Sequence, residues 1–286
     1  MSLAHREVHI NPADILDSLR IIYRDIRREV WSGIDLRTKD SVMKLAAIAD
    51  IHGNCTALEA VLADIAALGI SEVVNLGDHL SGPLEAQRTA DLLIARGFPS
   101  IRGDQDRVLV ELGPAGTSRR MDHRQLEQRH LDWLASLPQT LIYRGDVFLC
   151  HGSPNGDAAF WLDRVTADGT VRANSISAIE AEATGIDASL ILCGHTHIPR
   201  AVRLRDGRLV VNPGSVGCPG YDSPKPVYHK GQTGTPDACY AILERSARGW
   251  SVAFRYVPYD HMSMAQLART HGLPVWADAL ATGWVE

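Results

Sequence analysis

Short apolar runs that stop abruptly at polar or glycine residues are the clearest pattern along the chain. These runs lie at residues 45–49, 73–76, 99–102, 147–150 and 190–193. Runs of this length and composition predict buried strands. After the first run, helically spaced apolar residues predict a helix that ends at Gly69. Its stripe consists of Leu58, Val61, Leu62, Ile65 and Leu68. Strands that alternate with helices indicate an α/β domain.

The two ends of the chain show different patterns. Asn11, Pro12 and Gly33 have the positions of an N-cap, a first helical residue and a helix end, so they predict an amphipathic N-terminal helix. Near the other end, residues 237–245 and 250–257 predict a hairpin, followed by a helical tail over 262–280. We expect a helical extension at 1–43, a main domain at 44–260 and a C-terminal tail at 261–286 that packs on that domain. The apolar face of the N-terminal helix would pack on its own domain or on a second subunit, which allows a homo-oligomer.

Composition narrows the class of protein. The 286 residues, 45% of them hydrophobic, suffice for one large core. The five scattered cysteines include no C-x-x-C pair, which favours a reducing, cytoplasmic setting. No apolar run approaches the ~18 residues that span a bilayer, and no signal peptide is evident. The net charge of −5 gives no electrostatic footprint for binding duplex nucleic acid.

Metal-ligand side chains follow each predicted strand. The candidate ligands are Asp50, His52, Asp78, Asp104, His151, His195 and His197. Ligands collect beyond the carboxyl ends of strands in open α/β sheets, so these seven groups are expected to converge. A single histidine among the chain's 12 would be assigned to the surface or to a satisfied core position. Seven ligand-type residues at five strand ends instead predict a two-metal site with room for water.

The order of these motifs resembles the calcineurin-like metallophosphoesterase superfamily. The resemblance spans about residues 44–260. The motifs that carry it are Asp50-Ile51-His52-Gly53-Asn54, Gly77-Asp78, His151-Gly152, Gly194-His195-Thr196-His197 and Asn212-Pro213-Gly214-Ser215. The stretches at 50–54, 77–83, 151–154 and 212–217 look closest to small bacterial and archaeal phosphodiesterase-type members. The resemblance implies a four-layer α/β/β/α sandwich.

The same resemblance implies a ligand set for each of two divalent ions. Asp50, His52, Asp78 and His197 would hold the first ion. Asp78 would bridge to a second ion held with Asp104, His151 and His195. Mixed histidine and aspartate sites accept Mn, Fe, Zn, Co or Ni. Two such ions about 3.5–4 Å apart activate a bridging hydroxide and clamp the phosphoryl oxygens for in-line displacement.

Two positions depart from the family pattern. Asp104 stands where the family has asparagine, so it places an extra negative charge beside the ions. Gln105 stands where many phosphatases have a histidine that protonates the leaving group, and glutamine cannot titrate. His79 is a candidate substitute acid or a loop histidine bonded to backbone. Arg102 is a candidate phosphate ligand or a solvated strand-end arginine.

Residues 218–236 are rich in glycine, proline, aspartate and lysine and predict a long loop that folds over the cleft or stays a mobile surface segment. Its candidates for substrate contact are Tyr221, Lys225, Tyr228, His229 and Lys230. The expected function is dinuclear metal-dependent hydrolysis of a small phosphate ester, by a phosphodiesterase or nucleotide hydrolase. The alternatives are a phosphomonoesterase and a degenerate protein that binds metal or nucleotide with little turnover. The missing acid argues against a protein phosphatase.

Overall fold

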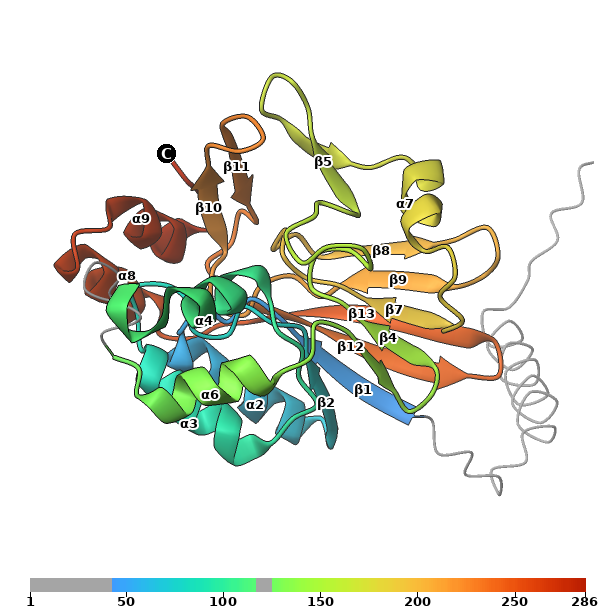
Figure 1. The fold of residues 1–286 in the computed structure, drawn as a ribbon, viewed down its shortest axis with the longest axis horizontal. Helices are drawn as coiled ribbons and strands as arrows, with labels where there is room; N and C mark the ends of the chain where they lie inside the picture. Colours follow the sequence, from blue (N-terminus) through green and yellow to red (C-terminus); the bar gives the residue numbers. More distant parts are fainter. Residues whose placement is uncertain (1–42, 117–124) are drawn as a thin grey trace, which may run out of the picture. The chain divides into compact units, whose positions relative to one another are not determined.

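The computed structural model describes residues 43–116 and 125–286 (Figure 1). Its helices are α2 (Cys55–Ala67), α3 (Ala86–Arg96), α4 (Asp104–Gly116), α6 (Gln128–Ser136), α7 (Ile176–Glu182), α8 (His261–Thr270) and α9 (Pro274–Thr282). Its strands up to the centre of the chain are β1 (Met43–Ile48), β2 (Glu72–Asn75), β3 (Leu141–Tyr143), β4 (Val147–Leu149), β5 (Asp163–Val165) and β6 (Val171–Ala173). The remaining strands are β7 (Leu190–Leu192), β8 (Arg200–Arg203), β9 (Leu209–Asn212), β10 (Gly220–Ser223), β11 (His229–Gln232), β12 (Ala238–Ser246) and β13 (Gly249–Val257).

Two sheets form the centre of the fold. The first has the order β13-β12-β1-β2, with β1 parallel to β2 and antiparallel to β12. The second has the order β3-β4-β7-β9-β8, and its three middle strands β4, β7 and β9 are parallel. The carboxyl ends of parallel neighbours meet at one sheet edge, so residues that follow these strands are brought together.

The sheets pack face to face, and helices cover their outer faces. Alternate residues of β1 point to opposite faces because the side-chain period of a strand is two. Leu45 and Ala47 join Leu192 and Val211 in a core between the sheets. Ala46 and Ile48 face the other way, into a core with α2. On the far face of the second sheet, Ile191 packs with residues of α7. The two sheets therefore form the inner layers, and α2 and α7 lie on the outside (Figure 1). This is the predicted α/β/β/α sandwich.

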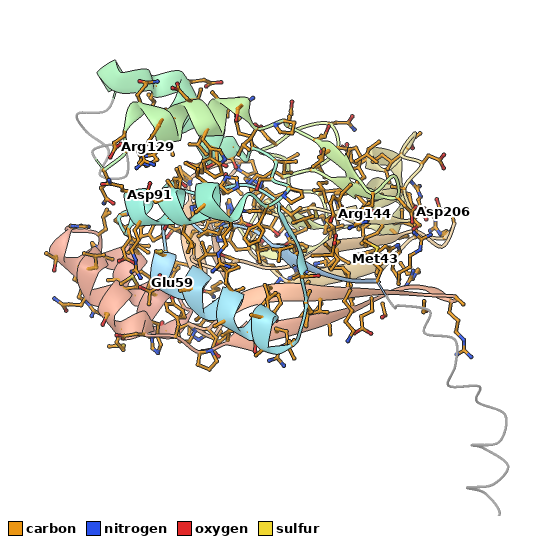
Figure 2. All side chains as sticks on the ribbon, turned by 90° about the horizontal axis from the view of Figure 1, so that it is seen from below. Met43, Glu59, Asp91, Arg129, Arg144 and Asp206 are labelled. Atoms are coloured by element: carbon orange, nitrogen blue, oxygen red, sulfur yellow. The ribbon has the colours of Figure 1, made fainter. Side chains whose placement is uncertain are left out.

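A smaller apolar cluster attaches α3, α4 and α6 to the loop after β2. It contains Leu80, Ala86, Ala90, Leu109 and Leu134. An ion pair between Arg129 of α6 and Asp91 of α3 measures 2.6 Å, and both side chains lie at the surface (Figure 2). Solvent screens such exposed pairs, so the apolar cluster is the main contact that holds these helices.

Three predicted elements differ from the structure. Residues 99–102 form only an isolated bridge between Ser100 and Asn75, because α4 begins at Asp104 and leaves no length for a strand. The predicted single helical tail is two helices, since Gly272 adopts a left-handed φ of 75° and Pro274 starts α9.

The predicted loop over 218–236 contains the β10–β11 hairpin instead. In it, the ring of Tyr221 crosses Gly231, where a Cβ atom would lie 2.3 Å from Tyr221 Cε1. The predicted N-terminal helix lies outside the described residues. Among the helices that are described, none is both long and apolar enough to cross a membrane.

Candidate metal centre

The seven predicted ligands come together where the two sheets meet. Asp50 and His52 follow β1, Asp78 follows β2, and Asp104 begins α4. From the second sheet, His151 follows β4, while His195 and His197 follow β7. Six of the seven side chains are buried, and His195 is half-buried. The parallel pairs β1–β2 and β4–β7 therefore deliver ligands from two different sheets to one place.

The backbone at most of these positions has an unusual conformation. Among the described residues, six that are not glycine have a positive φ. Five of them are candidate ligands: Asp50 (54°), His52 (51°), Asp78 (54°), His195 (69°) and His197 (61°). The sixth is Arg144, in the turn between β3 and β4 (Figure 2). Left-handed backbone costs on the order of 1–3 kcal/mol at residues other than glycine and concentrates at functional sites.

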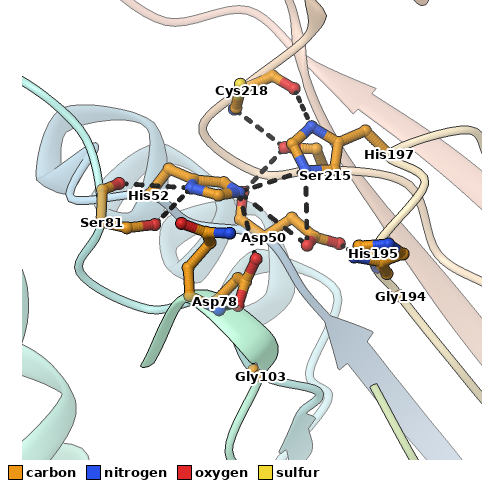
Figure 3. A network of polar contacts seen from close by, with 12 residues as sticks. Asp50, His52, Asp78, Ser81, Gly103, Gly194, His195, His197, Ser215 and Cys218 are labelled. Atoms are coloured by element: carbon orange, nitrogen blue, oxygen red, sulfur yellow. Dashed lines mark hydrogen bonds and ion pairs between the residues drawn. The ribbon is translucent and has the colours of Figure 1, made fainter. Parts of the chain in front are cut away.

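Three overlapping groups of ligand atoms result. Two of them share no residue and form two clusters, and the third contains Asp50, Asp78 and His151. In the first, His197 Nε2 lies 3.4 Å from Asp50 Oδ1 and 3.1 Å from His52 Nε2 (Figure 3). The second consists of Asp104, His151 and His195. Asp104 Oδ1 lies 3.0 Å from His195 Nδ1 and 3.3 Å from His151 Nε2. Within each cluster the ligand atoms all lie within 4.8 Å of one another, as they must to share one ion.

Asp78 stands between the clusters. Its Oδ2 lies 3.7 Å from His52 Nε2 of the first cluster and 3.3 Å from His151 Nε2 of the second. Its other oxygen, Oδ1, accepts a hydrogen bond of 2.9 Å from the Gln105 backbone N–H. One carboxylate oxygen thus faces both clusters, which is the position a bridging ligand requires.

Hydrogen bonds on the far side of three imidazoles fix their orientation. His52 Nδ1 lies 2.8 Å from Ser81 Oγ (Figure 3). His151 Nδ1 donates to the Leu76 carbonyl and His197 Nδ1 to the Cys218 carbonyl, each at 2.7 Å. A carbonyl acceptor requires the proton on Nδ1, so in the neutral imidazole Nε2 keeps a lone pair toward the centre. This arrangement is typical of histidines that bind metal ions.

Close backbone packing shapes the site. A Cβ atom at Gly103 would lie 2.1 Å from Asp78 Oδ1, so this position allows only glycine. On the opposite side, Ser215 Oγ donates to the Asp50 carbonyl at 2.7 Å, and Asn212 Nδ2 donates to the Gly194 carbonyl at 2.7 Å. The loop after β9 therefore supports the strand ends that carry the ligands.

The residues fit divalent cations. Asp50 Oδ1 and His151 Nε2 are buried and have no hydrogen-bond partner among the described residues, and both point into the clusters. Burial, with the neighbouring Asp104 carboxylate, raises the pKa of Asp78. Burial and the adjacent His197 lower the pKa of His52. Three carboxylates in a buried site need a compensating charge, and bound cations supply it.

The centre lies at the floor of a cavity of about 1180 Å³. The candidate ligands that line it are His52, Asp78, Asp104, His195 and His197. Asp50 and His151 are buried beneath them. This volume slightly exceeds the roughly 300–1000 Å³ of typical small-molecule pockets. A phosphate group alone would therefore fill only part of the cavity.

The structure places the other two predicted catalytic residues away from this cavity. His79 is fully buried, its Nδ1 is 2.7 Å from Asp106 Oδ2, and its ring packs edge-on against Trp133. The Arg102 backbone N–H donates to the Pro138 carbonyl. Neither residue is among those that line the cavity in the described part of the chain. His79 therefore pairs with a buried side chain, whereas the sequence suggested cleft or backbone contacts.

Asp106 is a positioning residue that was not among the predicted site residues. Its carboxylate accepts hydrogen bonds from the backbone N–H groups of Asp78, His79 and Gly103, at 2.9–3.0 Å. Although burial opposes it, the adjacent His79 and these N–H groups lower the pKa of Asp106 to about 2. The sequence signal that could have identified Asp106 is its position two residues after Asp104, in the motif that begins α4.

The remaining candidates lie on or beside the β10–β11 hairpin, and only some of them line the cavity. Tyr221, Lys225 and His229 line the cavity. Tyr228 is exposed on the surface, and Lys230 Nζ donates to the Val285 carbonyl. His271, before α9, also lines the cavity and was not predicted, because histidine at a helix end has no distinctive sequence signal.

Comparison with known proteins agrees with this geometry. The model of the calcineurin-like phosphoesterase superfamily domain matches residues 43–234. The chain belongs to this superfamily, as the motifs predicted. No curated protein matches the chain.

Two solved structures share the fold. One is a metallophosphoesterase from Sphaerobacter thermophilus, with 27% identity and a TM-score of 0.66 over 85% of this chain and 100% of that chain. The other is a hypothetical protein from Pyrococcus horikoshii OT3, with 19% identity and a TM-score of 0.65 over 85% of this chain and 99% of that chain. At 19% identity, the Pyrococcus horikoshii structure supports only the fold.

Proposed function

We propose that this protein is a metal-dependent phosphodiesterase with a two-ion centre. The observation that carries the proposal is the paired arrangement of ligands, in which Asp78 Oδ2 lies between a cluster at His52 and a cluster at His151. When bound, two divalent ions polarise the phosphoryl group and activate water for in-line attack. Mn, Fe, Zn, Co and Ni all suit this mixed set of ligands.

The chain's own residues hold and orient these groups. Asp50, His52 and His197 would hold one ion, and Asp104, His151 and His195 the other, with Asp78 shared. Their imidazoles are fixed by hydrogen bonds on the far side, so little reorganisation is needed when substrate binds. Phosphoryl transfer asks a protein mainly for positioning and charge neutralisation, and this site offers both without a serine or cysteine nucleophile.

Gln105 fits a phosphodiesterase, because many phosphatases of the superfamily have a histidine at this position. Its side chain lines the cavity, and Nε2 donates to Asp104 Oδ2 at 2.8 Å. An amide held in this way cannot deliver a proton to a leaving group. General acid catalysis is typically worth about 10²–10⁴-fold, and two bound ions that clamp both the attacking and the leaving oxygen would offset part of its absence.

The test is hydrolysis of bis-p-nitrophenyl phosphate and p-nitrophenyl phosphate by metal-stripped protein, before and after Mn²⁺ is added. We expect metal-dependent turnover that favours the diester. A preference for the monoester would instead indicate a phosphomonoesterase with an acid elsewhere in the cavity, and His229 and His271 are then the residues to replace. Metal binding without turnover of either ester would favour the degenerate binding protein.

An Asp78→Asn variant tests the shared ligand directly. Loss of the carboxylate that faces both clusters should lower diester turnover at least about 100-fold and reduce bound metal, since even partners outside the ligand set change affinity or activity about 10–100-fold. Metal content is measured by elemental analysis. Asp206→Asn, at an exposed carboxylate that pairs with Arg208, is the matched control. If Asp78→Asn kept both its metal and its activity, the bridging assignment would be wrong.

A further inference from the structure

Three aromatic side chains from separate segments surround the candidate metal centre. Trp276 lies on α9, Phe160 precedes β5, and Tyr221 lies on β10, and all three line the cavity. Each ring packs edge-on against a different candidate ligand. The ring centroids are 5.9 Å apart for Trp276 and His52, 5.4 Å for Phe160 and His195, and 4.9 Å for Tyr221 and His197. Flat apolar surfaces therefore border the centre at more than one ligand.

Trp276 is held in place from beneath. A Cβ atom at Gly82 would lie 2.9 Å from Trp276 Cη2, so glycine at this position lets the indole approach the loop that carries Ser81. Trp276 itself is half-buried and keeps surface toward the cavity. Helix α9 lies beyond residues 43–234, the segment that the family model matches. This wall is therefore supplied by the C-terminal helices of the chain.

The charge of the cavity limits how many phosphates a substrate carries. Apart from the candidate ligands, the described residues that line it include one cation, Lys225, and one anion, Asp222. These charges offset each other. Arginine and lysine are common ligands of phosphate groups, and the described residues that line the cavity carry no surplus of them. The cavity therefore suits a substrate with a single phosphate, placed at the metal centre.

We propose that the cavity binds a phosphodiester that joins two uncharged, ring-bearing groups, of the dinucleoside monophosphate class. One ring would lie against Trp276, and the other against Phe160 and Tyr221. The volume of about 1180 Å³ accommodates both groups. The proposal rests on the phosphodiesterase function proposed above, because the phosphate must sit between the two aromatic walls.

The test compares esters that share one leaving group. Thymidine 5′-(p-nitrophenyl phosphate), methyl p-nitrophenyl phosphate and p-nitrophenyl phosphorylcholine all release p-nitrophenol, so their kcat/KM values differ only through the other substituent. We expect kcat/KM for the thymidine ester to exceed that for the methyl ester by about 10- to 100-fold, the effect of one base stacked on an aromatic side chain.

Substitutions of the aromatic residues test which of them produce the preference for the thymidine ester. Trp276→Ala and Phe160→Ala should each lower the thymidine-to-methyl ratio about tenfold, and Trp276→Phe, which keeps a ring, should restore much of it. Trp284→Ala is the matched control, because that exposed tryptophan lies in the same C-terminal segment and does not line the cavity. A second readout is quenching of tryptophan fluorescence by thymidylyl-thymidine in metal-stripped protein, which should be weaker in Trp276→Phe than in the native protein.

The outcomes separate the two proposals. Turnover at equal rates for all three esters would overturn the dinucleoside proposal and leave the phosphodiesterase function standing. Preference for the phosphorylcholine ester would assign the cavity to a ring-free headgroup, and faster turnover of thymidine triphosphate would refute the single-phosphate argument. No turnover of any ester would overturn the phosphodiesterase function. In that case, quenching that depends on Trp276 would still support a ring-binding cavity, and its absence would reject it.

Discussion

At the scale of single residues, the candidate centre depends on groups that do not face it. The imidazoles of His52, His151 and His197 point Nε2 inward because their Nδ1 atoms bind Ser81, Leu76 and Cys218 on the outer side. Two of these partners are backbone carbonyls, which substitution cannot remove. Ser81 is the exception, since its hydroxyl oxygen lies 2.8 Å from Nδ1 and its carbonyl oxygen lies at 3.2 Å.

Ser81→Ala is therefore expected to weaken metal binding without abolishing it. The carbonyl remains as a longer partner, so the loss should fall near the lower end of the usual 10–100-fold range for such contacts, at about tenfold. Titration of metal-stripped protein against a competing chelator measures the affinity. Ser251→Ala, at an exposed position on β13, controls for loss of a hydroxyl. Unchanged affinity would show that the carbonyl alone orients His52.

At the scale of elements, α2 is joined to the first sheet by a polar contact as well as by its apolar face. Asp64 on α2 accepts hydrogen bonds from Arg255 of β13 at 2.7 Å and from Tyr240 of β12 at 2.6 Å. Its neighbour Ile65 is buried in the core beneath the helix. The contact with Arg255, and then that with Tyr240, holds the pKa of Asp64 below its ordinary value of 3.8.

Because the folded protein lowers this pKa, the stability that the Asp64 charge contributes is complete above pH 3.8 and is lost as the pH falls through the lowered value. We expect Asp64→Asn to have a lower urea midpoint than the native protein at pH 7, and the gap to narrow below about pH 4. The urea midpoints of both proteins are measured at pH values from 7 down to below about 4. Glu244→Gln, in the exposed pair with Lys44, should show little effect at either pH. A gap that widened in acid would contradict the assigned contacts.

At the scale of the whole molecule, the sandwich encloses every cysteine. All five are free and buried. Burial raises the pKa of Cys55 to about 11 and that of Cys239 to about 12, and it also raises the pKa values of Cys150 and Cys193. Since the thiolate is the reactive form, the cysteines beside the ligand motifs serve as packing groups. Cys218 differs in that it lines the cavity.

Native protein should therefore react with Ellman's reagent at no more than one thiol at pH 8, and at all five once unfolded in guanidinium chloride. Any fast thiol should be Cys218, so Cys218→Ala should remove it. Two or more fast thiols in the native protein would show that the layers around Cys55 or Cys150 open more readily than their burial implies.

The sequence determined the central strands, the covering helix α2 and the seven candidate ligands. These follow from local chemistry, because an apolar run that ends at Asp50, Asp78, His151 or His195 marks both a strand and its functional end. The short segment at 99–102 and the break at Gly272 were misjudged, since the same pattern permits a strand or a bridge, and one helix or two. Propensity is a weak guide where neighbouring elements limit the available length.

Only the tertiary structure decided how the ligands group and what surrounds them. His79 follows the central Asp78 directly, yet both its ring and its backbone N–H contact the buried Asp106. Trp276 lies over 200 residues from His52 in the chain, and its ring is 5.9 Å away in space. Contacts of that separation depend on how sheets and helices pack, and no local pattern encodes them. The candidate ligands could therefore be predicted from the sequence, whereas the cavity that surrounds them could not.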